Sequence, residues 1–131
     1  MPVSLALQVQ TGTYAVARLA PDAPVPSWVP VTGFTSVTRT ADELSIVCAS
    51  GAVPADVEPV EAGWSLLTLE GPFEFTLTGI LAAVLVPLAE AGIGIFALST
   101  FDTDHLLVKH AQLDETVAAL ESAGHVVTRP G

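Results

Sequence analysis

The chain has 131 residues, of which half are apolar and 14% are charged, against roughly 25% charged in an average soluble domain. Fourteen acidic side chains against four basic ones give a formal net charge of −10. A surface this acidic repels nucleic-acid phosphates and anionic lipids, and the apolar half excludes an intrinsically disordered chain. The length fits one domain of ordinary size or two small ones.

Cysteine content and hydropathy narrow the class further. The single cysteine, Cys48, excludes an internal disulfide and a paired-cysteine metal or redox site. The N-terminal segment has no basic residues before its apolar stretch, so we expect no signal peptide. The longest apolar run, residues 79–89, contains Pro87 and is shorter than the roughly 20 residues that cross a bilayer. We therefore expect a cytoplasmic protein that binds neither membranes nor nucleic acid.

The first half of the chain predicts short strands around a proline-rich loop. Leu5, Leu7 and Val9 alternate with less apolar residues, which is typical of a half-buried strand. Four prolines between residues 21 and 30 exclude a helix longer than about one turn there. We predict strands over residues 3–9, 14–19, 33–39 and 44–48, then a linker over 51–63.

The second half predicts two helices among four strands. Thr78 or Thr76 is the expected N-cap of the first helix, and Pro87 is expected to kink it. The nearly continuous apolar run at residues 93–99 indicates a strand with both faces covered. Apolar residues at helical spacing predict the second helix. We predict strands over residues 64–70, 93–99, 104–109 and 125–128, and helices over 79–91 and 111–123.

This order, β-α-β-β-α-β, is that of the ferredoxin-like fold, in which two helices cover one face of a four-stranded antiparallel sheet. An internal repeat accompanies it, because residues 36–47 align without a gap with residues 97–108 at an offset of 61. Both segments predict a strand, a polar turn and a second strand. We therefore expect an α+β protein of two ferredoxin-like βαββαβ modules in tandem, the first one degenerate, over residues 1–60 and 61–131.

A family resemblance follows from the second half. Residues 78–108 read TGILAAVLVPLAEAGIGIFALSTFDTDHLLV and are followed by LDETVAALESAGH. This string resembles the ACT domains, small ferredoxin-like modules that bind amino acids and regulate metabolic enzymes. It is most similar to the paired ACT domains of aspartate kinases and to stand-alone tandem-ACT proteins related to the cytosolic arginine sensors of animals. The segment RTADELSIVC at residues 39–48 resembles the first module of that stand-alone group.

A free amino acid needs partners for a carboxylate and an ammonium group. Backbone N–H groups at the start of a helix suit the carboxylate, and the carbonyls and acidic side chains of the turn at residues 100–104 suit the ammonium. By resemblance to the arginine sensors, Gly79 and Ile80 match positions that contact the backbone of the ligand. Thr100, Phe101 and Asp104 match positions that line the other side of the ligand. The sensors carry acidic residues where this chain has Thr76 and Leu77, which argues against a guanidinium ligand and for a small or neutral amino acid. The predicted ligand-binding residues are Thr76, Leu77, Thr78, Gly79, Ile80, Thr100, Phe101 and Asp104.

Each of these residues also has an ordinary structural interpretation. The threonines before the first helix can be helix caps, and Gly79 can serve packing alone. Aspartates are common in turns without any ligand, and Phe101 can be a core or interface aromatic. A metal at Asp102, Asp104 and His105 would match no established spacing, so we expect no metal and no cofactor.

Three functions remain open. The first is a non-catalytic regulatory module that binds a small amino acid at an interface between ACT domains. The second is a protein–protein or dimerisation module that has kept the fold and lost the ligand. The third is a small enzyme using Asp102, Asp104 and His105 as acid and base, which the absence of a nucleophile or cofactor motif disfavours. Under the first two we expect a homodimer and a regulated enzyme as partner, because the open sheet face and sheet edge need covering.

Overall fold

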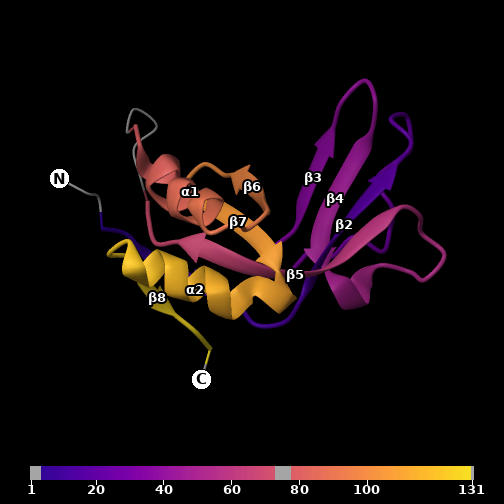
Figure 1. Cartoon of the computed structure of the whole chain (residues 1–131). Coiled ribbons are helices and arrows are strands. Elements are labelled where there is room, and N and C mark those ends of the chain that lie inside the picture. Colours follow the sequence, from indigo (N-terminus) through magenta and orange to yellow (C-terminus); the bar gives the residue numbers. More distant parts are fainter. Residues whose placement is uncertain (1–3, 73–77, 131) are drawn as a thin grey trace. The chain divides into compact units, whose positions relative to one another are not determined.

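The computed structural model describes residues 4–72 and 78–130. By their internal contacts they form two compact units, one made of residues 12–64 and the other of residues 1–11 together with 65–131. We call the first the β unit and the second the α+β unit (Figure 1). This division differs from the expected boundary after residue 60, because the N-terminal strand belongs with the C-terminal half. Within the described residues, no helix is long and apolar enough to cross a membrane.

The β unit is built from strands alone, apart from one short 3-10 turn at Ser50–Ala52. Strands β3 (Ser36–Arg39), β4 (Leu44–Ala49) and β2 (Tyr14–Leu19) pair antiparallel in that order, and β2 also pairs with the first half of β5 (Val60–Leu69). Residues 12–64 contain no α-helix, so the first module is reduced, as the proline-rich loop predicts.

The core of the β unit packs against the face of β4 that carries Leu44, Ile46 and Cys48, all fully buried. Trp28 packs against this cluster. Burial raises the pKa of the Cys48 thiol, so this cysteine behaves as an apolar core residue.

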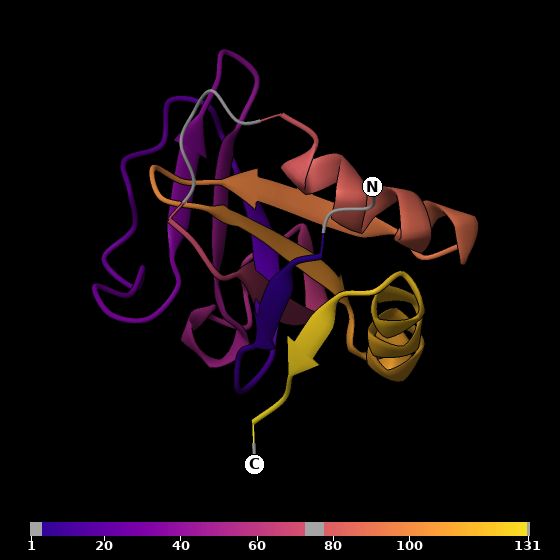
Figure 2. The same ribbon diagram turned by 90° about the vertical axis from the view of Figure 1, so that its left-hand side faces the viewer.

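The α+β unit contains the predicted β-α-β-β-α-β order. Its strands β6 (Ile95–Ser99), β7 (Asp104–Lys109) and β8 (Val126–Thr128) follow the predictions closely, as do helices α1 (Ile80–Glu90) and α2 (Leu113–Ser122). Both helices pack on one face of the sheet, where leucine and valine side chains from strands and helices form the core (Figure 2).

One strand more than predicted lies in this sheet. Its order is β6-β7-β5-β1-β8, in which β1 (Ala6–Val9) lies between β5 and β8. Strand β1 pairs antiparallel with β5 and parallel with β8. The expected four-stranded sheet was therefore wrong, because the buried Leu7 from the start of the chain fills the place between the first and last strands of the module.

Two further expectations need correction. Strand β6 is only partly buried, with residues 97 and 99 exposed, because it comes last in the strand order and pairs with β7. The repeat is also shifted by one residue. Arg39 pairs with Leu44 and Ser99 with Asp104, so the two hairpins correspond at an offset of 60. That offset also aligns the buried runs 46–48 and 106–108, which the gapless sequence match did not.

Helix α1 has a different N-cap from the predicted threonines. Gly79 caps it with φ of 79°, a left-handed conformation that favours glycine, and no side chain donates or accepts a capping hydrogen bond. The helix continues through Pro87 to Glu90. A proline has no N–H, so it leaves the carbonyl four residues earlier, that of Ala83, without its helical donor.

His125 supplies the missing donor. Its Nε2 lies 2.8 Å from the Ala83 carbonyl oxygen, and its Nδ1 accepts a hydrogen bond from the Leu5 N–H at 3.0 Å. The bond at Nδ1 places the ring proton on Nε2, where it serves Ala83. His125 is almost completely buried, with 4% of its surface exposed. It therefore joins α1 to the N-terminal strand segment.

Candidate functional site

The turn between β6 and β7, with the first residue of β7, carries half of the predicted site residues that the structure describes, namely Thr100, Phe101 and Asp104. The Thr100 N–H and hydroxyl both donate to the Thr103 carbonyl, at 2.8 and 3.1 Å, and close the turn. The Thr103 hydroxyl donates to the Leu69 carbonyl at 2.7 Å. Because Leu69 is the last residue of β5, this bond fastens the turn to the end of that strand.

His105 attaches the same turn to β5 a second time. Its Nδ1 lies 3.0 Å from the Thr68 hydroxyl and its Nε2 lies 3.2 Å from the Thr100 hydroxyl. Burial lowers the pKa of His105 below its usual value of 6.5, and the neighbouring Asp104 carboxylate opposes that shift. A neutral imidazole offers one donor and one acceptor, which suits a position between two hydroxyl groups.

A polar strip lies on the sheet face opposite the helices. Leu7, Leu67 and Leu69 face the helices, so the alternation of side chains places Gln8, Thr68 and Glu70 on the other face. The Gln8 amide donates to the Glu70 carboxylate at 3.0 Å across the two strands.

This strip and the turn enclose an open pocket of about 490 Å³ at the end of β5. Its polar side chains are those of Gln8, Thr68, Glu70, Asp102 and Thr103, and Leu69, Gly71 and Pro72 complete the lining. The pocket thus holds two carboxylates, and its described lining includes no lysine or arginine. It can accept hydrogen bonds from a cationic group far more readily than it can hold an anion.

The predicted ligand residues have different fates. Thr76 and Leu77 lie outside the described residues. Thr78 and Gly79 are exposed, while Ile80 is partly buried and packs against the core. None of these three belongs to the lining that the structure describes for the pocket.

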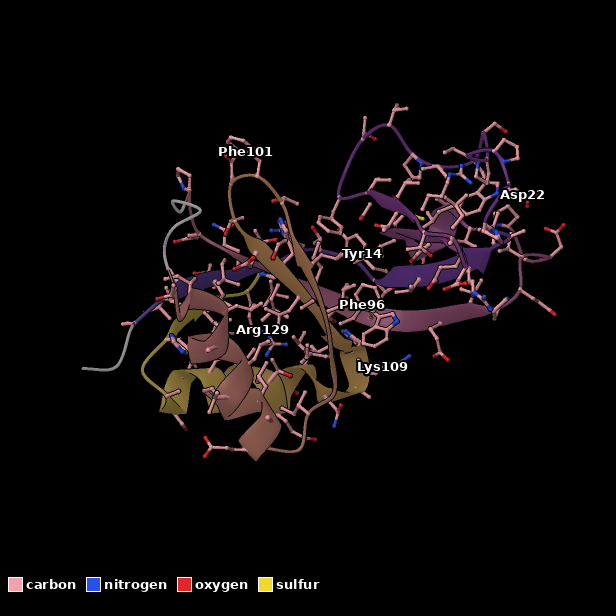
Figure 3. All side chains as sticks on the ribbon, turned by 90° about the horizontal axis from the view of Figure 1, so that it is seen from above. Tyr14, Asp22, Phe96, Phe101, Lys109 and Arg129 are labelled. Atoms are coloured by element: carbon pink, nitrogen blue, oxygen red, sulfur yellow. The ribbon has the colours of Figure 1, made fainter. Side chains whose placement is uncertain are left out.

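In the turn, Phe101 is 79% exposed at the hairpin tip, which rules out a role in the core (Figure 3). Thr100 and Asp104 flank the pocket-lining residues Asp102 and Thr103 in the chain. The Asp104 carboxylate accepts a hydrogen bond from the Ser99 hydroxyl, its cross-strand partner. Within residues 4–72 and 78–130, no group of three His, Cys, Asp or Glu side chains is placed to hold a metal ion.

None of the residues whose polar side chains line the pocket is among the predicted ligand-binding residues; they are Gln8, Thr68, Glu70, Asp102 and Thr103. Thr68 and Glu70 lie in a predicted strand, and their alternation with buried leucines is a readable signal of an outward face. Gln8 lies 62 residues from its partner Glu70, and no local pattern predicts that β1 pairs with β5.

A family model described as an ACT domain matches residues 60–122, and a second model, described as the N-terminal domain of its own family, matches residues 12–56. A crystal structure of an Agobacterium tumefaciens protein is 45% identical to the chain, with a TM-score of 0.92. The match covers 98% of this chain and 96% of that one. The chain belongs to the ACT-domain family.

This ACT-domain protein also resembles more distant structures in fold. A Vibrio cholerae protein described as of unknown function and a possible transport protein is 21% identical, with a TM-score of 0.71, over 92% of this chain and 91% of that one. The regulatory subunit of aspartate kinase from Thermus thermophilus is 12% identical, with a TM-score of 0.62, over 94% and 99% of the two chains. The latter likeness extends over both units and is consistent with ACT-type modules in tandem. No curated protein matches the sequence.

Proposed function

We propose that this ACT-domain protein is a non-catalytic regulatory module that binds a small amino acid. The observation that carries the proposal is the open pocket at the end of β5, which lies mainly in the segment matched by the ACT model. Its volume of about 490 Å³ falls within the usual range for small-molecule sites. The turn at residues 100–104 is fastened to β5 through Thr103 and His105, so that wall of the pocket is pre-formed.

We propose that the ligand contacts both the residues predicted from the sequence and the residues that line the pocket. The turn with Thr100, Phe101 and Asp104 would border one end of the ligand. The backbone at the start of α1, near Gly79 and Ile80, would approach its other end. The regulatory role is supported by the fold shared with the aspartate kinase regulatory subunit, and we propose an enzyme of amino-acid metabolism as the partner.

A thermal-shift measurement with each of the twenty amino acids tests this function. A ligand at a hundredfold excess over its Kd stabilises the folded state by about 2.7 kcal/mol. For a chain of this size the gain raises Tm by roughly 3–6 °C. We expect one or a few small or neutral amino acids to produce such a shift, whereas a flat response to the whole panel at millimolar concentration would refute amino-acid binding.

A second candidate function rests on helix α1. Residues 80–89 of this helix are all apolar, yet only Val84 and Leu88 are buried, and Val86 is 54% exposed. An exposed apolar helix face favours association. We therefore propose that the protein forms a homodimer, and that dimerisation is its function if it has lost the ligand.

A further inference from the structure

We propose that the pocket at the end of β5 receives the primary ammonium group of the ligand, so that the protein selects its ligand by the amine and not by the carboxylate. The inference rests on the proposed amino-acid-binding function and specifies which chemical group decides affinity. It predicts that small primary amines without a carboxylate are also ligands.

The charges around the pocket favour an ammonium group over a carboxylate. The carboxylates of Glu70 and Asp102 line it. The α+β unit contains two basic residues, Lys109 and Arg129, and Arg129 forms an ion pair with Asp114 at 2.8 Å. Lys109 ends β7, which begins at Asp104 next to the pocket turn. A strand of that length places it about 16 Å further along. A ligand carboxylate in the pocket would therefore meet two like charges, and neither basic residue of the α+β unit belongs to the described lining.

The hydrogen bonds around the pocket fix acceptors that suit an ammonium group. An ammonium group has three donors and needs acceptors in several directions. The Gln8 amide donates to Glu70 and so orients its carboxylate toward the sheet face. The hydroxyl of Thr103 gives its proton to the Leu69 carbonyl, which leaves its oxygen as an acceptor at the pocket wall. Acceptors fixed before binding lower the entropy cost of capturing the ligand.

The pocket lies between two segments that hydrogen bonds already connect. Thr68 links the pocket to His105, and His105 in turn holds Thr100 of the turn. A ligand bound between Glu70, which directly follows β5, and Asp102 in the turn therefore bridges two segments that are already fastened together. We expect the ammonium group to lie between these carboxylates, with the rest of the ligand extending out of the open pocket.

The experiment compares matched ligands on the full chain. Each amino acid that stabilises the protein is tested beside its C-terminal amide, which keeps the amine, and its des-amino acid, which keeps the carboxylate. The pair n-butylamine and butyrate provides probes independent of any amino acid. Kd is measured by calorimetry for the wild type and for E70Q, D102N and E90Q. Glu90 is exposed at the end of α1, outside the pocket lining, so E90Q is a control with the same change of charge.

We expect E70Q and D102N each to weaken binding about tenfold or more, because each removes a charge-assisted hydrogen bond. E90Q should leave Kd within twofold, and the des-amino acid should bind more weakly than the amide. Glu70 and Asp102 are both exposed, so their variants are expected to fold, which the circular dichroism spectrum and the Tm without ligand will verify.

Other outcomes separate the two proposals. If an amino acid binds and E70Q and D102N retain wild-type affinity, the ammonium assignment is overturned and the proposed function stands. Binding of the des-amino acid in preference to the amide would overturn it equally. If no amino acid binds but n-butylamine does, and E70Q abolishes that binding, the amine site is supported and the amino-acid function fails. Failure of all probes refutes both.

Discussion

His105 is the residue by which pH affects stability at the candidate site. It bridges Thr68 of β5 and Thr100 of the turn, and burial lowers its pKa below 6.5. In a pH range just below 6.5 the unfolded chain therefore binds a proton at this position that the folded chain resists. Unfolding then takes up protons, so stability falls as the pH decreases from about 6.5 through the folded pKa.

We therefore predict that the variant H105Q has a flatter dependence of stability on pH below 6.5 than the wild type. The free energy of unfolding in urea, measured at half-unit steps from pH 7.5 to pH 4.5, gives the comparison. H110Q is the matched control, since it removes an exposed histidine and leaves the contribution of His105 in place. Identical slopes for H105Q and the wild type would contradict the assignment.

Individual residues also show what the sequence could and could not predict. The buried alternation of Leu5, Leu7 and Val9 was readable because one strand face was apolar. The Thr caps were wrong because a glycine with positive φ can cap a helix by its backbone alone, without the side-chain signal that threonine offers. The interaction between Gln8 and Glu70 was invisible because it depends on strand pairing across 62 residues.

At the scale of elements, the order of helices and strands along the chain was easier to predict than which strands are neighbours in the sheet. Local periodicity gave α2, β7 and the hairpins, because each is fixed by contacts within a few residues. The insertion of β1 between β5 and β8 depends on long-range pairing and has no local signal. The alignment of the two repeated hairpins was wrong by one residue for the same reason. The register of a hairpin is set by the pairing of its strands and not by which amino acids match in a sequence alignment.

Helix α1 provides an element-scale prediction, because Pro87 and His125 are two parts of one arrangement. His125 donates to the Ala83 carbonyl that Pro87 leaves without a helical partner. H125A should cost about 2–5 kcal/mol, because it leaves the Ala83 carbonyl and the Leu5 N–H unsatisfied in a buried site. In the P87A background residue 87 regains an N–H for Ala83, so the same change should cost less.

A double-mutant cycle measured by urea unfolding tests this coupling. We expect the free energy of unfolding of the double variant P87A/H125A to exceed, by about 0.5–3 kcal/mol, the value that the two single effects predict when they are added. The pair P87A and H110A is the control, because His110 is exposed and its partner is Ser65 of another element. Additive effects for Pro87 and His125 would show that the carbonyl of Ala83 finds another donor.

At the scale of the whole molecule, the distribution of charge limits how two copies can meet. Each chain carries a formal net charge of −10, so most of its surface repels a second copy. Residues 80–89 of α1 carry no charge, and their exposed positions 82, 86 and 89 fall on one side of the helix at spacings of four and three residues. This apolar side is therefore where two copies can approach without like-charge repulsion.

We predict that V86E makes the protein monomeric under conditions in which the wild type is a dimer. Light scattering at tens of micromolar protein measures the mass, and V31E is the matched control because Val31 is 99% exposed in a loop of the β unit. Added salt should strengthen the wild-type dimer, since it screens the repulsion between two acidic chains while leaving the apolar contact in place. A wild-type monomer at tens of micromolar would contradict dimerisation, and a dimer that survives V86E would move the interface away from α1.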